Sequence, residues 1–321
     1  MSVRSTLTRA SVLIAAGLAA ALTLSACGSS DPLASSSSAA ASGSAASGSG
    51  SESAAGGPIV IGSANFPESA LIANIYAAAL KAKGVEASTN LNIGSREIYL
   101  KALQDGSIDL VPEYSGVLLQ YFDPTATAVS SDDVYTALVA KTPSGLKVLT
   151  KSAAEDKDAV VVTKATADAN NLKSIADLAP VASTFVLGGP PEWATRPTGV
   201  PGLKEKYGLT FKEFKALDAG GPLTLGALTS DQIQAGNLFT TDPSIPANDL
   251  VVLEDPKNLF AAQNVLPLIN AAKSTPQVQT ALDAVSAKLD TATLTELLTK
   301  VQVDKEDSAQ VAQEWVAANL Q

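Results

Sequence analysis

An acid and an aromatic residue, Glu113 and Tyr114, directly follow an apolar stretch in the segment LVPEYSG, residues 110–116. The run over residues 108–111 predicts a short buried strand. Pro112 lacks the N–H that a sheet ladder needs, so we expect strand pairing to end there. Both side chains would then lie at a carboxyl edge of the sheet. Because ligands of open α/β sheets bind in the crevice beyond that edge, this segment is a candidate binding site.

Composition excludes several kinds of chemistry. The 321 residues include no histidine and a single cysteine, Cys27, which argues against histidine acid/base catalysis, cysteine nucleophiles and Cys/His metal sites in the mature domain. No nucleophile elbow, phosphate-binding loop or dinucleotide fingerprint is found. The net charge of −10, with no basic run beyond the N-terminus, argues against nucleic acid. We therefore expect a protein that is not an enzyme and needs no metal or cofactor.

The N-terminus indicates export. Residues 1–26 carry Arg4 and Arg9, an apolar stretch over 12–24 and small residues before Cys27, which is typical of a secretory signal peptide. The segment LSAC resembles a bacterial lipobox, which implies that Cys27 becomes lipidated and anchors the protein to the extracytoplasmic face of the membrane. An ordinary secreted protein cut after Ala26 is the alternative. Residues 27–57, rich in Ser, Ala and Gly, predict a flexible linker.

The remainder alternates between strand and helix patterns from residue 58 onward. Its first part predicts a β-α-β-α-β unit and hence the start of a mainly parallel sheet. Further strands are expected over 158–164, 183–189, 237–243 and 249–255. The last block, from residue 264, predicts one strand and three helices, and we expect it to return to the first lobe, with Trp315 in the core.

Six blocks in order resemble the substrate-binding lipoproteins of osmoprotectant ABC transporters, which bind glycine betaine, carnitine and choline. The blocks are IGSANFPES, LNIGSREIYLKALQDGSIDLVPEYSG, EDKDAVVV, PEWATRPTGVPGLKEKYGL, LFTTDPSI and LEDPKNLFAAQNVLPLI. The resemblance implies an α/β, two-lobed periplasmic-binding-protein fold (type II), with two hinge crossings near Asp158 and Gln263. Lobe 1 would comprise 58–158 plus 264–321, and lobe 2 would comprise 159–263. It also implies a monomer that delivers a small solute to an ABC permease and its ATPase.

The resemblance also implies a set of ligand-binding residues. A trimethylammonium group is held by aromatic faces, and a carboxylate is held by a guanidinium group. Tyr114 matches an aromatic cage residue, Phe239 stands where the family usually has tyrosine, and Arg196 matches the carboxylate clamp. Asp158 and Gln263 occupy positions that are tyrosine in four-ring cages. Asn65, just before the first helix, is a further candidate.

Each assignment has a structural alternative. Tyr114 and Phe239 could simply pack in the core, Arg196 could form a surface or interlobe ion pair, Asp158 could be a turn acid, and Asn65 could cap the first helix.

Two other positions depart from the family pattern. Ala64 stands where some members have a lysine, and Val117 stands where many have a threonine. These departures remove two anion contacts, so the expected ligand is a quaternary ammonium compound or another small polar or cationic solute. A sensory or adhesive lipoprotein with the same fold remains an alternative, as does an enzyme on that fold.

Overall fold

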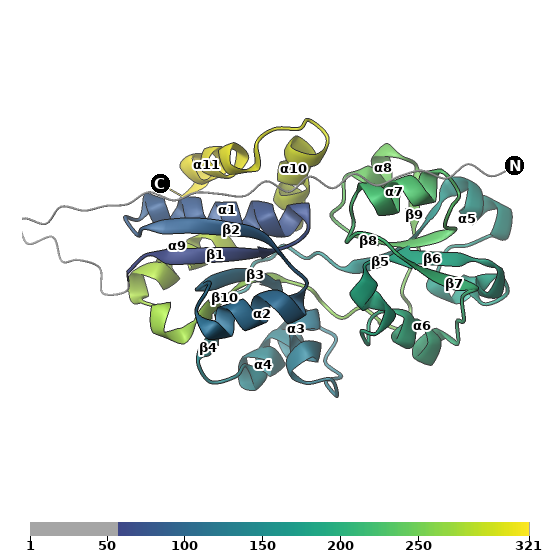
Figure 1. Ribbon diagram of the computed structural model, residues 1–321, viewed down its shortest axis with the longest axis horizontal. Coiled ribbons are helices and arrows are strands. Elements are labelled where there is room, and N and C mark those ends of the chain that lie inside the picture. The colour runs from purple at the N-terminus through teal and green to yellow at the C-terminus, as the bar shows by residue number, and fades with distance from the viewer. Residues whose placement is uncertain (1–56, 321) are drawn as a thin grey trace, which may run out of the picture. The chain divides into compact units, whose positions relative to one another are not determined.

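The computed structural model describes residues 57–320, and its strands form two five-stranded sheets (Figure 1). The first sheet has the order β2-β1-β3-β10-β4, and the second has the order β7-β6-β8-β5-β9. The strands of the first sheet are β1 (Ile59–Ala64), β2 (Ala87–Gly94), β3 (Leu110–Tyr114), β4 (Leu146–Val148) and β10 (Val265–Asn270). Those of the second are β5 (Asp158–Thr163), β6 (Val186–Gly189), β7 (Glu213–Ala216), β8 (Ala235–Phe239) and β9 (Leu250–Val252).

Both sheets follow the same plan. Three neighbouring strands run parallel, namely β2-β1-β3 in the first sheet and β7-β6-β8 in the second. One long strand then lies antiparallel between the third of these and an edge strand: β10 in the first sheet and β5 in the second. The chain enters the second sheet through β5 and returns to the first through β10. The predicted β-α-β-α-β unit is confirmed, but each whole sheet is mixed.

Helices cover both faces of the first sheet. Apolar side chains of α1, α9, α10 and α11 form one core cluster against it, and those of α2, α3 and α4 form another (Figure 1). The bounds of these helices are α1 (Pro67–Ala82), α2 (Arg96–Asp105), α3 (Ser115–Phe122), α4 (Ser131–Lys141), α9 (Pro276–Ser286), α10 (Thr291–Gln302) and α11 (Ser308–Asn319). Three helices therefore follow β10 and pack on the first lobe, and Trp315 lies in its core as expected.

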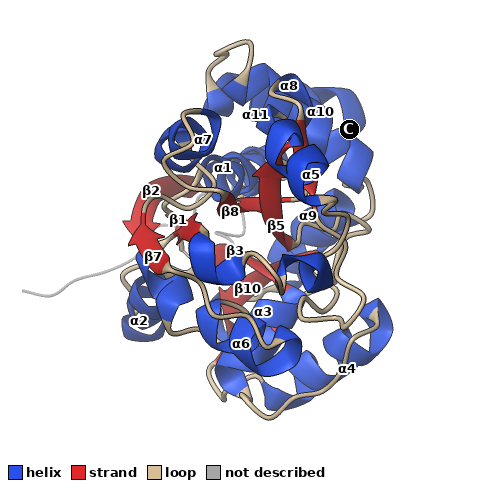
Figure 2. Ribbon diagram, turned by 90° about the vertical axis from the view of Figure 1, so that its right-hand side faces the viewer, coloured by secondary structure: helices blue, strands red, loops and turns tan. Residues whose placement is uncertain are grey.

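The second sheet is covered by shorter elements. Its helices are α5 (Lys164–Asn170), α6 (Val200–Tyr207), α7 (Pro222–Thr229) and α8 (Ser244–Ala247), which lie on the side that faces the viewer in Figure 2. Short 3₁₀ helices lie at Ile175–Leu178, Ala182–Thr184, Pro191–Ala194 and, beyond β10, Ala271–Lys273. One core cluster holds Trp193 and Leu203, and the other holds Leu228 and Ile233. Each lobe therefore has its own core.

The expectation that pairing ends at Pro112 is wrong. Strand β3 continues through Pro112 to Tyr114, and Pro112 lies opposite Pro267 of the antiparallel strand β10. The carbonyl of Pro267 accepts a hydrogen bond from Leu149 on the other side of β10, so the two prolines form a non-hydrogen-bonded pair. Neither ring removes a ladder bond between β3 and β10, which lets the strand carry Tyr114 to its end.

The described helices include none that is both long and apolar enough to cross a membrane. The predicted signal peptide, Cys27 and nearly all of the linker lie outside the described residues.

Candidate functional site

A cavity lies where the two sheets face each other with the carboxyl ends of their parallel strands. It is lined by residues that follow β1, β2, β6 and β7, by the ends of β3 and β8 and by the connections that lead into β5 and β10. This is the edge at which open α/β sheets bind ligands. All six ligand-binding residues expected from the sequence line it: Asn65, Tyr114, Asp158, Arg196, Phe239 and Gln263.

Three aromatic rings form one wall of the cavity. Phe66 and Phe239, from different lobes, stack with ring centroids 5.0 Å apart and an interplanar angle of 30°. The Phe66 and Tyr114 rings lie 6.0 Å apart at 33°. Gly220 permits the position of Phe239, because its φ of +62° suits glycine and a Cβ there would come within 2.7 Å of the Phe239 ring. The wall thus joins the two lobes.

Tyr114 is buried, and its hydroxyl donates a 2.7 Å hydrogen bond to Glu68 of α1. The other Glu68 oxygen accepts from the hydroxyl of Thr241, which follows β8 in the second lobe. Asp156, in the connection to β5, accepts from the backbone N–H of Thr241. Burial raises the pKa of Glu68, and burial together with the charge of Glu68 raises the pKa of Asp156. A carboxyl pair of this kind favours holding a proton at the base of the cleft.

A buried ion pair supports the end of β3 from within the first lobe. The guanidinium of Arg96 donates two 2.8 Å hydrogen bonds to the two oxygens of Glu113. The Tyr99 hydroxyl and the Tyr114 backbone N–H also donate to Glu113. Glu113 is fully buried and accepts four hydrogen bonds, so its charge is well compensated.

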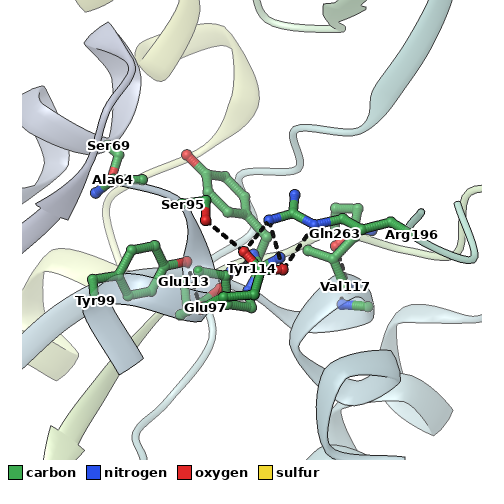
Figure 3. A network of polar contacts seen from close by, with 12 residues as sticks. Ala64, Ser69, Ser95, Glu97, Tyr99, Glu113, Tyr114, Val117, Arg196 and Gln263 are labelled. Atoms are coloured by element: carbon green, nitrogen blue, oxygen red, sulfur yellow. Dashed lines mark hydrogen bonds and ion pairs between the residues drawn. The ribbon is translucent and has the colours of Figure 1, made fainter. Parts of the chain in front are cut away.

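Arg196 pairs with an acid across the cleft. Its Nε and Nη2 atoms lie 3.2 Å from Glu97 Oε1, and Nη2 also lies 3.1 Å from Oε2 (Figure 3). Glu97 belongs to α2 of the first lobe and also accepts a hydrogen bond from Ser95. Burial alone would raise the pKa of Glu97, but the hydrogen bonds from Arg196 and Ser95 and the charge of Arg196 lower it to about 2. Arg196 therefore lines the cavity as part of an interlobe ion pair.

At the start of the second sheet lies a carboxylate, that of Asp158, which has no cationic partner among the described residues. Asp158 begins β5, and its Oδ1 accepts a 2.9 Å hydrogen bond from the Nδ2 of Asn237 on β8. Burial raises the pKa of Asp158, while that hydrogen bond and the charge of Arg196 lower it in part. Among the described residues, the buried Oδ1 of Asn237 and Nε1 of Trp193 have no hydrogen-bond partner, and both residues line the cavity. Such groups are satisfied when a ligand or water reaches them.

Gln263 has a structural role in addition to its place in the cavity. Its Oε1 accepts hydrogen bonds from the backbone N–H groups of Gly116 and Val117, in the first turn of α3. The connection that leads into β10 thus caps that helix. Gly116 is required there, because a Cβ would lie 2.6 Å from the carbonyl oxygen of Ala262.

Asn65 does not cap the first helix. Phe66 holds the N-cap position of α1, and the exposed Asn65 side chain lines the cavity instead. Ala64 and Val117, the two departures from the family pattern, also line the cavity. Their side chains are apolar, so neither supplies an anion contact.

Known proteins share this architecture. Residues 57–318 match the family model described as the substrate binding domain of ABC-type glycine betaine transport systems. The chain belongs to this family.

Individual relatives of the glycine betaine transport family agree with the match. The glycine betaine-binding protein YehZ of Escherichia coli is 27% identical over 276 residues, covering 82% of this chain and 90% of that protein. The carnitine transport binding protein OpuCC of Listeria monocytogenes is 23% identical over 282 residues, covering 81% and 86%. A crystal structure of a glycine betaine/carnitine/choline ABC transporter protein aligns with a TM-score of 0.64 and 22% identity, covering 81% of this chain and 98% of that one. As a family member, the protein is the solute-binding component that delivers its solute to a permease.

Three cavity residues, and the glutamate that pairs with Arg196, were not identified from the sequence. Phe66, Asn237 and Glu97 carried no assigned role, and Trp193 had no pattern that separated it from core. Phe66 had one usable signal, because it lies two residues after the first strand and precedes a proline that starts a helix. Glu97 had none, since its partner Arg196 is distant in the sequence and belongs to the other lobe.

Proposed function

We propose that the protein binds a small methylated ammonium solute in the cavity between its lobes and passes it to an ABC permease. The single observation that supports this most is the wall of Phe66, Tyr114 and Phe239. A quaternary ammonium group has no N–H to donate, so aromatic faces are the groups best suited to hold it. Relatives whose names specify glycine betaine or carnitine support the same chemical class.

We further propose that the lobes open and close about the two connections that lead into β5 and β10, near Asp158 and Gln263. Three contacts hold the lobes together in this structure: the Phe66–Phe239 stack, the Glu68–Thr241 hydrogen bond and the Glu97–Arg196 ion pair. A solute must part these contacts to enter. Since it would touch both lobes, it would favour the closed state once bound.

Export and anchoring complete the proposal. The signal sequence and the lipobox-like segment support acylation of Cys27 and a monomeric protein held at the extracytoplasmic face of the membrane. Replacing Cys27 with Ser should release the folded protein from the membrane fraction, and unchanged retention would contradict the anchor. We expect solute binding without turnover, because the relatives named above are transport proteins.

The aromatic wall can be tested with tetramethylammonium, which carries the methylated cation alone. Calorimetric titration should show binding, and Phe239→Leu should weaken it by about 1 kcal/mol, roughly fivefold, because leucine keeps apolar bulk but loses the ring face. Phe122→Leu is the matched control, since Phe122 packs in the first lobe outside the cavity. Equal affinities in the two variants would mean that Phe239 only packs the lobe interface.

A further inference from the structure

We propose that Glu97 determines specificity: by occupying Arg196, it makes the cavity select a cation without a carboxylate over a zwitterion with the same methylated head. The inference rests on the proposed function, because it concerns the part of the solute that lies beyond its ammonium group. Its basis is the pairing of the charges around the cavity.

The guanidinium of Arg196 is already bound to a carboxylate, through its Nε and Nη2 atoms. Two of its nitrogens contact both oxygens of Glu97 within 3.2 Å, which is the fork geometry that arginine uses for carboxylates. The hydroxyl of Ser95 lies 2.6 Å from Glu97 and holds that carboxylate in place. A second acid, Glu192, lies 3.8 Å from Arg196. A solute carboxylate would have to displace Glu97 and then remain close to both acids.

The other cation of the cavity wall is occupied as well. Arg96 forms two hydrogen bonds with Glu113 in the interior of the first lobe, where its side chain is 8% exposed. The cavity lining contains no lysine. Within the described residues, therefore, each cation that lines the cavity already has a carboxylate partner.

The acids of the cavity wall are not balanced in this way. Asp158 forms no ion pair among the described residues and is hydrogen-bonded to Asn237 alone. Glu97 and Glu113 match the two arginines, which leaves Asp156, Asp158 and Glu192 of the cavity lining as excess acids. Like charges brought together at a recognition site oppose binding, whereas a cation is attracted. Asp158 therefore supplies the countercharge for the solute.

An unpartnered acceptor indicates the chemistry of the solute's polar end. The amide of Asn237 donates to Asp158, and its buried Oδ1 has no donor among the described residues. A hydroxyl group can donate to this oxygen, but a carboxylate cannot. The cavity thus suits a methylated ammonium alcohol better than a methylated amino acid.

Three probes with the same head separate these effects: tetramethylammonium, choline and glycine betaine. They end in a methyl group, a hydroxymethyl group and a carboxylate, respectively. Calorimetric titration of the wild-type protein should show choline binding at least about tenfold more tightly than glycine betaine, with tetramethylammonium between them. In Glu97→Gln the freed Arg196 should strengthen glycine betaine binding, so that the ratio shrinks about tenfold.

Further variants distinguish this role of Glu97 from the effect of a general change in charge. Glu213→Gln removes an exposed acid of the second lobe far from the cavity lining and should leave the ratio unchanged. The double variant Glu97→Gln/Arg196→Gln removes both charges of the pair together, so the ratio should stay near that of the wild type; this variant serves if Glu97→Gln fails to fold. A larger loss of affinity for glycine betaine than for choline in the double variant would show that Arg196 holds the solute carboxylate and would overturn the inference.

The possible failures are distinguishable. Tighter binding of glycine betaine than of choline by the wild type, or an unchanged ratio in Glu97→Gln, would overturn the role of Glu97 and leave the proposed function standing. Binding of none of the three probes would overturn the proposed function, and this inference with it.

Discussion

Arg96 and Arg196 both line the cavity and both pair with a glutamate, but the two pairs differ in their surroundings. The Arg96–Glu113 pair lies inside one lobe, with side chains 8% and 0% exposed. The Arg196–Glu97 pair joins the two lobes, with side chains 23% and 43% exposed. A buried pair cannot be separated without leaving a charge in the interior, whereas a pair at the cleft can exchange its partners for water. The first pair therefore stabilises its lobe, and the second can take part in the opening of the cleft and in the selection of the solute.

The largest effect is expected from breaking the pair within the lobe. Glu113→Gln removes the countercharge of Arg96 and should lower the free energy of unfolding by about 3–5 kcal/mol, because it leaves a buried cation uncompensated. Urea unfolding measures this as a lower midpoint at unchanged slope. Glu86→Gln, at an exposed acid of the same lobe, is the matched control and should change stability by less than about 0.5 kcal/mol. Similar midpoints for the two variants would show that the buried pair is not a stability element.

Some of this architecture could be predicted from the sequence and some could not. Apolar runs located the strands. The family resemblance correctly grouped six residues in one cavity, because each lies close to the end or the start of a strand and can be placed from its local sequence. The passage of β3 through Pro112 could not be predicted, since it depends on the register against β10. The roles of Glu97 and Phe66 were also missed, because their partners Arg196 and Phe239 lie in the other lobe and meet them only in the folded protein.

A third contact combines features of the two arginine pairs: it joins the two lobes, and it is made by buried carboxyl groups. Burial is the main cause that raises the pKa of Glu68, against the hydrogen bonds from Thr241 and Tyr114. A carboxyl whose pKa is higher in the folded than in the unfolded protein binds more protons when folded. Stability must then fall as the pH rises above the ordinary pKa of 4.5.

We therefore expect the free energy of unfolding of the wild type to decrease as the pH rises above about 4.5, and to decrease less in Glu68→Gln. The amide removes one of the two titrating groups and can donate to Asp156. Urea unfolding at a series of pH values tests this, with Glu86→Gln expected to keep the wild-type slope. If the free energy of unfolding changed with pH in Glu68→Gln as steeply as in the wild type, the pH dependence would come from other groups. The Glu68 contact would then resemble the Arg196–Glu97 pair, which can be separated easily.

The smallest effect on stability is expected from breaking the pair across the cleft. Glu97→Gln should lower the free energy of unfolding by about 1 kcal/mol or less, since partly exposed ion pairs gain little over their hydration and are screened by salt. Urea unfolding without solute, at low and high salt, measures it, and Lys164→Gln, which breaks the exposed Lys164–Asp168 pair, provides the comparison. A loss of stability as large as that of Glu113→Gln would mean that the two arginine pairs stabilise the fold equally. A small loss of stability, alongside altered solute selectivity, would separate them, because the pairing of Glu97 with Arg196 would then act on the choice of solute and not on the stability of the fold.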